Sequence, residues 1–281
     1  MWYKRMYNKV YVEISNVCNM NCSFCHGHSR APRQMSEEEF VFILDRLTEH
    51  TKYIYYHLMG EPLIHPQLHE FIRLAGARGY QSVITTNGTL LHTRKEELLA
   101  AGLHKVNISL HSFEEGGDEA FISYIRHIAD FARSAAAAGT IVVFRLWNKG
   151  FDNGRNVFAL EQLKQEIPGD WADNSRGIRI REKLFIELDE RFDWPDSCAE
   201  IQGNKFYCYA LKTQFGILAD GTVVPCCLDS DGVINLGNIF RDDINEILRS
   251  ERAADIVRGF QCGRAVEDLC KRCGYAQRFV R

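Results

Sequence analysis

Several features that would narrow the function at once are missing from this sequence of 281 residues. Nothing approaches the ~18 consecutive apolar residues of a membrane-spanning helix, and the first residues hold no uninterrupted apolar stretch of the kind that directs secretion. The basic excess of a general nucleic-acid binder is also missing, since 37 acidic and 34 basic residues give a formal net charge of −3. These absences predict a cytoplasmic protein with no membrane or nucleic-acid partner.

The composition that remains is that of an ordinary globular protein. Apolar residues make up 46% of the chain and charged residues 25%, which is enough to build a core and argues against disorder. No solenoid-type repeat and no low-complexity linker divides the chain. The length therefore allows either one large α/β barrel or two smaller domains.

Up to about residue 190, strand-like and helix-like runs alternate. Ser36 is a helix N-cap followed by acidic residues, and Phe40, Ile43 and Leu47 recur at helical spacing. This alternation predicts parallel strands joined by helical crossovers. The strand-like runs are 10–14, 53–58, 82–86, 106–110, 141–146 and 183–188, and the helix-like runs are 36–50, 67–78, 94–101, 119–138 and 157–165.

Six such units fall short of the eight that close a barrel, so the predicted fold class is α/β, a partial (β/α)6 TIM-like barrel. Beyond residue 193 the pattern changes to a hairpin with Asp220-Gly221 as its turn, a short extended run at 234–240 and a helix over 244–257. We therefore predict two domains, a barrel over 1–192 and a small C-terminal cysteine-rich hairpin-plus-helix extension over 193–281.

Ten cysteines in a protein without a secretion signal are more readily explained as metal ligands or catalytic groups than as disulfides. They fall into two groups separated by a long stretch that contains none. The first group is Cys18, Cys22 and Cys25, and the second is Cys198, Cys208, Cys226, Cys227, Cys262, Cys270 and Cys273.

The first group lies within eight residues on a loop that follows the first predicted strand. Thiolates are soft ligands that suit iron–sulfur clusters or zinc. A structural zinc ion takes four ligands, so a zinc site would need a distant fourth, such as His26 or His28. Three ligands on a four-iron cluster would instead leave one iron open to another molecule.

Together with residues further along the chain, this loop resembles the radical S-adenosylmethionine (radical SAM) superfamily over roughly 10–190. Phe24 precedes the third cysteine as in that family, and Met59-Gly60-Glu61-Pro62 stands where the family has its Gly-Gly-Glu motif, with Met59 replacing the first glycine. The segments 85–88 and 107–111 resemble the ends of the family's third and fourth strands. A glycine also suits a backbone that approaches a ligand closely. The resemblance implies SAM binding by Phe24, Met59, Gly60, Glu61, Asn87, Ser109 and Arg145.

The resemblance further implies a [4Fe–4S] cluster on Cys18, Cys22 and Cys25 whose open iron binds SAM. One electron passed into SAM would split it into methionine and a 5′-deoxyadenosyl radical, which removes a hydrogen atom from a small-molecule substrate. It also implies an electron donor of the flavodoxin or ferredoxin type.

The second group contains four thiols that can complete a tetrahedral set, two near the predicted hairpin and two in a distant Cys-x-x-Cys. Zinc is one occupant of such a set. The pattern also resembles the twitch form of the SPASM extension, which implies an auxiliary [4Fe–4S] cluster, and we expect only one because no cysteine follows before Arg281. The implied ligands are Cys208, Cys226, Cys270 and Cys273, and the cysteines left as buried thiols or alternative ligands are Cys198, Cys227 and Cys262.

Polar side chains at the predicted strand ends are candidates for substrate binding. Arg145 could pair with a carboxylate of SAM or of the substrate, and Arg145 and Glu187 are the candidate catalytic residues. Each of these residues could instead cap a loop or helix. The full set is His57, Asn87, Asn107, His111, Arg145, Asn148 and Glu187.

For the reaction, the overall run of the chain resembles the queuine lyases of base salvage, which implies a lyase that acts on a modified nucleobase such as queuine and releases a 7-deazaguanine base. Trp147 or Phe144 could stack on such a base while Glu187 binds its edge. Three alternatives remain open: an alcohol dehydrogenase of the twitch type acting on an aminoglycoside precursor, a maturase of ribosomal peptides, and a non-catalytic iron–sulfur module.

Overall fold

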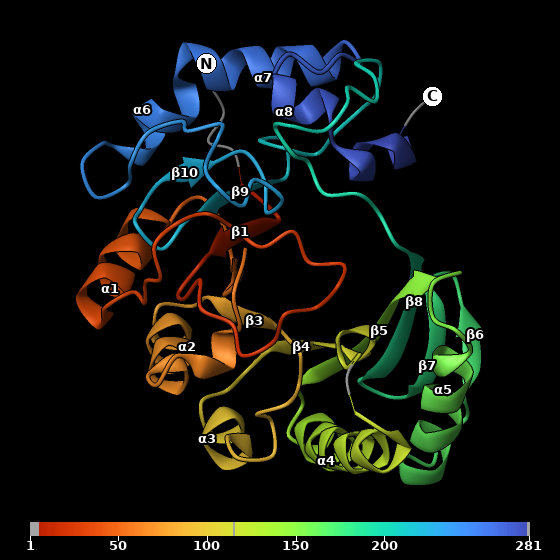
Figure 1. The fold of residues 1–281 in the computed structure, drawn as a ribbon. Coiled ribbons are helices and arrows are strands. Elements are labelled where there is room, and N and C mark those ends of the chain that lie inside the picture. Colours follow the sequence, from red (N-terminus) through yellow and green to blue (C-terminus); the bar gives the residue numbers. More distant parts are fainter. Residues whose placement is uncertain (1–5, 115, 280–281) are drawn as a thin grey trace.

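The computed structural model describes residues 6–114 and 116–279, and a ten-stranded sheet lies at its centre in the order β10-β9-β1-β2-β3-β4-β5-β8-β7-β6 (Figure 1). Six neighbouring strands of this sheet are parallel, which confirms the predicted partial barrel. They are β1 (Lys9–Val12), β2 (Tyr53–Tyr55), β3 (Gln81–Thr86), β4 (Lys105–Ser109), β5 (Ile141–Lys149) and β8 (Leu184–Glu190).

Helices cover the outer side of these strands, as Figure 1 shows. The first begins at Ser36, whose hydroxyl accepts from the Glu39 N–H while the Glu39 carboxylate accepts from the Ser36 N–H, a complete capping box. The helices of the barrel are α1 (Glu37–Arg46), α2 (Leu68–Ala77), α3 (Lys95–Ala100), α4 (Asp118–Ala137) and α5 (Arg155–Glu166), with short 3₁₀ turns η1 (Pro62–Ile64) and η2 (Leu110–Ser112).

The two faces of the sheet have different compositions because successive side chains on a strand point to opposite sides. Ile108 and Phe144 belong to the buried core that includes Ile125 and Ile128 of α4. Phe144 is therefore fully buried on the helix side, and the prediction that it stacks on a substrate is wrong. The alternate residues of each strand face the inner side of the barrel.

A hairpin absent from our prediction lies between α5 and β8. Its strands, β6 (Ala172–Asn174) and β7 (Gly177–Arg181), pair antiparallel with each other, and β7 pairs antiparallel with β8 at the edge of the sheet. The segment is rich in charged residues and largely exposed. Edge strands of this kind lack the apolar run by which buried strands are found in a sequence.

The C-terminal extension continues the sheet of the barrel. The predicted hairpin is present as β9 (Gln214–Ile217) and β10 (Val223–Val224), and β9 pairs parallel with β1. The predicted domain boundary at residue 193 lies in the stretch 191–213, which contains no helix and no strand. The division into two domains remains a prediction. Residues 1–5, 280 and 281 of the two predicted domains lie outside the described residues.

Two details of the extension differ from the prediction. Residues 234–240 form no strand and only a single bridge, between Thr222 and Asn238. The expected helix over 244–257 is two helices, α6 (Ile244–Arg249) and α7 (Glu251–Gln261), because the Ser250 hydroxyl accepts from the Ala253 N–H and starts a new helix. A short α8 (Asp268–Lys271) and a 3₁₀ turn, η3 (Gly274–Phe279), follow. Of the helices that the structure describes, none has the length and apolar character to cross a membrane.

Candidate active site

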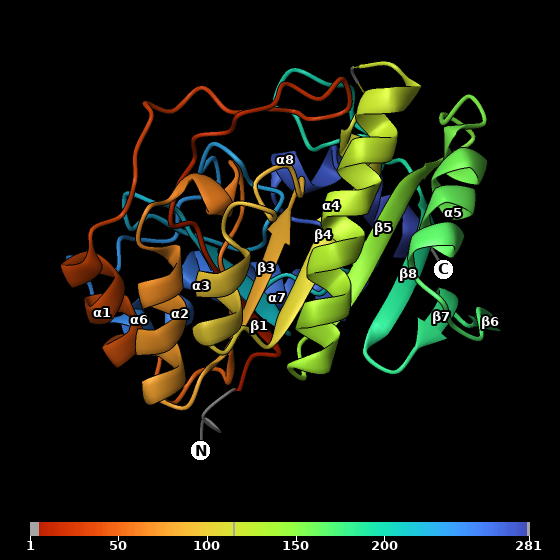
Figure 2. The same cartoon turned by 90° about the horizontal axis from the view of Figure 1, so that it is seen from below.

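Cys18, Cys22 and Cys25 all lie on the loop that connects β1 to α1, here called the cysteine loop (residues 13–35). Figure 2 shows this loop (red) crossing the end of the sheet toward which β3 points. The Cys25 N–H donates to the Cys22 carbonyl at 3.0 Å, and the Met20 N–H donates to the Cys18 sulfur at 3.5 Å. The three thiols therefore lie at the carboxyl ends of the strands, where barrel enzymes carry out their chemistry.

The two histidines of the loop have contacts that do not involve the thiols. His28 Nε2 is 2.9 Å from the Asn16 carbonyl oxygen, and the Asn16 side chain also bonds the Ala31 carbonyl and the Arg33 N–H. His26 is stacked on Trp194 with a centroid separation of 6.4 Å. His28 therefore braces the loop, and His26 packs it against the segment that follows β8.

Gly60 lies directly beneath the base of the cysteine loop. It has a φ of +75°, and a Cβ atom on it would be 2.5 Å from the Ser15 carbonyl oxygen. The neighbouring Glu61 N–H donates to the Val17 carbonyl at 2.8 Å. The glycine at this position is required first by the chain's own backbone, which approaches too closely for any side chain.

Glu61 ties the end of β2 to the end of β3. Its buried carboxylate accepts from the Thr86 hydroxyl and the Asn87 N–H, both at 2.7 Å, and from the Leu63 N–H at 3.0 Å. Burial raises the pKa of Glu61 to about 7, although these hydrogen bonds favour the ionised form. Because both carboxylate oxygens accept hydrogen bonds from the chain, Glu61 holds the ends of β2 and β3 in a fixed arrangement.

Asn87 brings the end of β3 to the cysteine loop. Its amide donates to the Asn19 side-chain oxygen at 2.8 Å, and its own oxygen accepts from the Thr89 N–H and hydroxyl. Asn19 in turn donates to the Thr89 hydroxyl at 2.9 Å. Asn19 lies between Cys18 and Cys22 in the chain, so the predicted SAM-binding residue Asn87 contacts the segment that carries the thiols.

On the other side of the loop, Phe24 packs against His111, with ring centroids 4.9 Å apart. His111 Nδ1 is 3.0 Å from the Arg145 carbonyl oxygen. The Ser23 N–H and hydroxyl both bond the Glu114 carboxylate at 2.6 Å. The ends of β4 and β5 therefore hold the second half of the loop.

Ser109, Arg145 and Glu187 lie in a row across three parallel strands. Ser109 is opposite Arg145 in the pairing of β4 with β5, and Arg145 is opposite Glu187 in the pairing of β5 with β8. Arg145 Nε lies 3.3 Å from the Glu187 carboxylate, and its guanidinium sits 4.4 Å from the centroid of the Trp147 ring. The structure thus brings together the predicted catalytic pair on the inner face.

The remaining predicted substrate residues divide into two kinds. His57 lies between Tyr11 and Tyr55, and burial lowers its pKa to about 3, so it is neutral in the folded protein. Asn107 is buried, and its amide donates to Thr85 and to the Ile84 carbonyl. Asn148 instead accepts from the Asn156 side chain of α5 at 2.9 Å, a contact that ties the end of β5 to that helix.

The second group of cysteines gathers where β10, α8 and the stretch before β9 meet. Cys208, Cys226, Cys270 and Cys273 affect one another electrostatically, and burial raises the pKa of each, that of Cys273 to about 11. Cys227 is electrostatically coupled to Cys208, Cys226 and Cys273 as well, and its side chain is hydrogen-bonded to Tyr11. All ten cysteines are free thiols, and Cys198 and Cys262 are exposed.

The thiols suit a cluster better than a single metal ion. Burial raises the pKa of Cys22 to about 12, so only a strongly cationic group would hold it as thiolate. Within residues 6–114 and 116–279, no three His, Cys, Asp or Glu side chains converge closely enough to ligate one ion. In a four-iron cluster each thiolate binds a different iron, so its ligands stand further apart than the ligands of one zinc ion.

Comparisons with known proteins agree with this geometry. The model of the radical SAM superfamily matches residues 12–146, and the model of an iron–sulfur cluster-binding domain, SPASM, matches residues 208–274. A probable GTP 3′,8-cyclase of Methanocella arvoryzae is 32% identical over 291 residues, covering 88% of this chain and 90% of that protein. The chain belongs to the radical SAM superfamily.

Solved structures show the same fold. SuiB of Streptococcus suis bound to S-adenosylmethionine has a TM-score of 0.63 at 16% identity, covering 96% of this chain and 72% of that one. BtrN in complex with AdoMet and 2-DOIA has a TM-score of 0.60 at 18% identity, covering 95% and 93%. As a radical SAM protein with a SPASM domain, the chain is an enzyme that carries a SAM-binding [4Fe–4S] cluster and an auxiliary iron–sulfur cluster.

The structure adds inner-face residues of this radical SAM barrel that sequence reasoning missed. Lys105 lies two positions before Asn107 and four before Ser109 on β4, so it shares their face. Lys9 and Tyr11 share the inner face of β1, and Tyr55 shares that of β2, where its ring packs against Tyr11. These residues could have been found from the sequence, because a charged or phenolic residue within a β-branched run is excluded from the core side of the strand and must lie on the other face.

Proposed function

We propose that Cys18, Cys22 and Cys25 hold the SAM-binding cluster of this enzyme. The support is their shared loop, braced at its base by Gly60 and at its far side by Phe24 and Ser23. The neighbouring groups would seat SAM itself. They are Phe24, Met59, Gly60, Glu61, Asn87, Ser109 and Arg145, all of which belong to the loop or to the strand ends beside it.

Cys208, Cys226, Cys270 and Cys273 would hold the auxiliary cluster. Their buried thiols are electrostatically coupled, and all four belong to the region that the SPASM model matches. The assignment of residues 1–192 to the barrel and 193–281 to this cluster domain follows the same grouping of thiols. An electron donor of the flavodoxin or ferredoxin type and a cytoplasmic location fit this chemistry.

When bound, the SAM-binding cluster supplies the electron that cleaves SAM to a 5′-deoxyadenosyl radical. The chain's own residues have the tasks of seating the substrate and excluding water. Arg145 orients the Glu187 carboxylate on the inner face, in line with Ser109. Trp147, against which the Arg145 guanidinium is stacked, adds a flat apolar surface at the end of β5.

The substrate that suits this row is a small molecule with a guanine-type ring. A carboxylate accepts two hydrogen bonds from the N–H groups along the edge of such a ring, and an aromatic surface stacks on its face. The Arg145–Glu187 pair beside Trp147 is the single observation that carries this proposal. Queuine contains a 7-deazaguanine ring, and the GTP named in the relatives' GTP 3′,8-cyclase activity contains guanine.

Two reactions therefore share one kind of site. The lyase reaction, release of a 7-deazaguanine base from queuine, is the one that the sequence as a whole favours. A cyclisation of a guanine nucleotide is the one that the names of the relatives favour.

The test is anaerobic reconstitution followed by measurement of iron, sulfide and 5′-deoxyadenosine. After reduction with dithionite in the presence of SAM, we expect queuine or GTP to raise 5′-deoxyadenosine formation, and an aminoglycoside and an unrelated peptide to leave it unchanged. Product analysis then separates the released base from a cyclised nucleotide. Stimulation by the aminoglycoside or peptide alone would refute the guanine-ring proposal.

A further inference from the structure

Four cationic side chains of the inner barrel have no carboxylate partner in the described residues. Lys9 and Lys105 are the first residues of β1 and β4, Arg176 lies in the turn between β6 and β7, and Arg179 lies on β7 opposite Phe185. None of them takes part in a salt bridge. A group of unpaired cations on the concave face of a sheet is unusual, because like charges repel each other.

The carboxylates close to these cations are already paired. Glu187 is bound to Arg145 at 3.3 Å, and Asp189, two residues along the same strand, is bound to Arg278 at 2.6 Å. Glu13, just past β1, is bound to Arg30 at 2.7 Å. These carboxylate charges are therefore shared with other cations, although Glu187 also acts electrostatically on Lys9 and Lys105.

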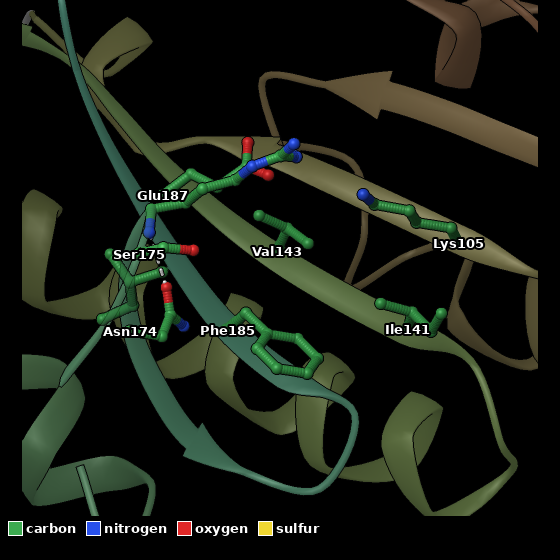
Figure 3. A pocket seen from close by; sticks show the side chains of 9 residues that line it. Lys105, Ile141, Val143, Asn174, Ser175, Phe185 and Glu187 are labelled. Carbon is green, nitrogen blue, oxygen red and sulfur yellow. Dashed lines mark hydrogen bonds between the residues drawn. The ribbon is translucent and has the colours of Figure 1, made fainter. Parts of the chain in front are cut away.

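A cavity of about 200 Å³ lies beside two of the four cations. Lys105, Arg176 and Glu187 line it, together with Asn174, Ser175 and Phe185. In Figure 3 the Lys105 amine extends from β4 across the cavity toward the strand that carries Glu187. The cavity thus has a cationic side and borders on the row that we assign to the guanine-type ring.

We propose that this cavity binds an anionic oxygen group of the substrate, a phosphate or a carboxylate, through Lys105 and Arg176. The inference rests on the proposed function, which it narrows: the guanine-type ring would belong to a phosphorylated or acidic molecule and not to a neutral free base. Arg176 can donate two hydrogen bonds to one such group, and Lys105 adds a mobile point charge.

The distance along β4 from Lys105 to Ser109 matches the length of a nucleotide. Lys105 and Ser109 are four residues apart on β4, which at about 3.3 Å per residue corresponds to roughly 13 Å. A ring at the Ser109–Arg145–Glu187 row and an anionic group near Lys105 would therefore lie at the two ends of one nucleoside phosphate. Burial lowers the pKa of Lys105, the Glu187 carboxylate raises it, and the neighbouring Arg145, Lys9 and Arg176 lower it again, so a bound anion would add to the compensation that Glu187 provides.

The experiment is equilibrium binding to the reconstituted protein, measured by calorimetry. The probes are guanosine, guanosine 5′-monophosphate, pyrophosphate and citrate, and the variants are Lys105→Gln and Arg176→Gln. Lys52→Gln is the control, because Lys52 is exposed between α1 and β2. We expect the monophosphate to bind about tenfold or more tightly than guanosine, and either cavity variant to lose most of that preference while the control keeps it.

Competition identifies the anion. Displacement of the monophosphate by pyrophosphate and not by citrate would assign the cavity to phosphate, and the reverse would assign it to carboxylate. Equal binding of guanosine and its monophosphate, or an unchanged preference in both cavity variants, would overturn the inference. If guanosine or queuine nevertheless stimulated 5′-deoxyadenosine formation, the proposed function would stand without the anion site. If pyrophosphate bound through Lys105 but no guanine compound bound, the proposed function would fail and the anion site would stand.

Discussion

Arg30 and Glu13 form a two-point ion pair, with distances of 2.7 and 2.8 Å between the guanidinium nitrogens and the carboxylate oxygens. Glu13 is fully buried and also accepts from the backbone N–H groups of Met59 and Ala219. Arg30 donates in addition to the Ser230 carbonyl. One ion pair therefore joins the cysteine loop, the Gly-Glu motif and the C-terminal extension.

Removing Arg30 should destabilise the whole protein. In Arg30→Met the Glu13 carboxylate would stay buried without its cation, which typically costs about 3–5 kcal/mol. The free energy of unfolding from urea titrations measures this. Arg73→Met, which breaks an exposed pair with Glu70, is the control and should change stability by less than about 0.5 kcal/mol. Equal effects of the two variants would contradict the role given to the buried pair.

Gly60→Ala should cost more than Gly79→Ala. Both glycines have positive φ, at +75° and +83°, so both variants carry backbone strain of about 1 kcal/mol. Only at Gly60 would the new Cβ meet backbone, whereas at Gly79 it would meet open space. Overpacking of this kind adds about 1–3 kcal/mol. Thermal unfolding compares the two, and SAM binding should weaken only in Gly60→Ala; indistinguishable variants would show that the close approach is not needed.

The two cysteine groups should lose iron independently. Cys22→Ala should abolish 5′-deoxyadenosine formation, because the SAM-binding cluster loses a ligand. Cys270→Ala should lower iron from about eight to about four per chain while SAM binding persists. Cys198→Ala, at an exposed thiol, should leave both readouts unchanged. Retained SAM cleavage in Cys22→Ala, or unchanged iron in Cys270→Ala, would refute the respective ligand assignment.

Glu61 should make the stability of the iron-free protein fall as pH rises. Its pKa is raised in the folded state to about 7 from an ordinary value near 4.5, so the folded protein holds this proton more tightly than the unfolded chain. The stabilisation is complete below pH 4.5 and is lost between about 4.5 and 7, on the order of 3 kcal/mol in all.

Buried His57 and His111 act in the opposite direction, since burial lowers their pKa values to about 3 and about 4. The measurement is therefore the difference between wild type and Glu61→Gln in unfolding free energy across pH 4–8. We expect this difference to change by a few kcal/mol across the window, whereas the exposed control Glu96→Gln should stay close to wild type throughout. A flat difference for Glu61→Gln would show that Glu61 does not bind the proton.

Glu187→Gln should weaken binding of a guanine-type ring by about ten- to a hundredfold. An amide accepts at only one of its two atoms, so one of the two ring N–H groups would lose its partner. Glu182→Gln, an exposed neighbour, serves as the control. Calorimetric affinity for guanosine or queuine measures the effect. If both variants bound equally well, the ring would not lie on Glu187.

The barrel and the first group of cysteines were predictable because their sequence signals are local. The runs at 82–86 and 106–110 lie on buried parallel strands, and such strands stand out through their β-branched residues. Cys18, Cys22 and Cys25 sit within one loop, so their spacing alone indicates a shared centre. The β6–β7 hairpin escaped prediction because β6 is exposed along its length and β7 is a short strand with only Ile178 and Ile180 between arginines.

The sequence by itself determined the element order and the two sets of thiols, since periodicity and ligand spacing are properties of neighbouring residues. Tertiary structure alone decided which face each side chain joins and which distant groups meet. It placed Phe144 in the core and Trp147 beside Arg145, and it assembled Lys105 with Arg176. The physical reason is strand register: pairing brings residues 109, 145 and 187 into one row, and no local pattern records that alignment.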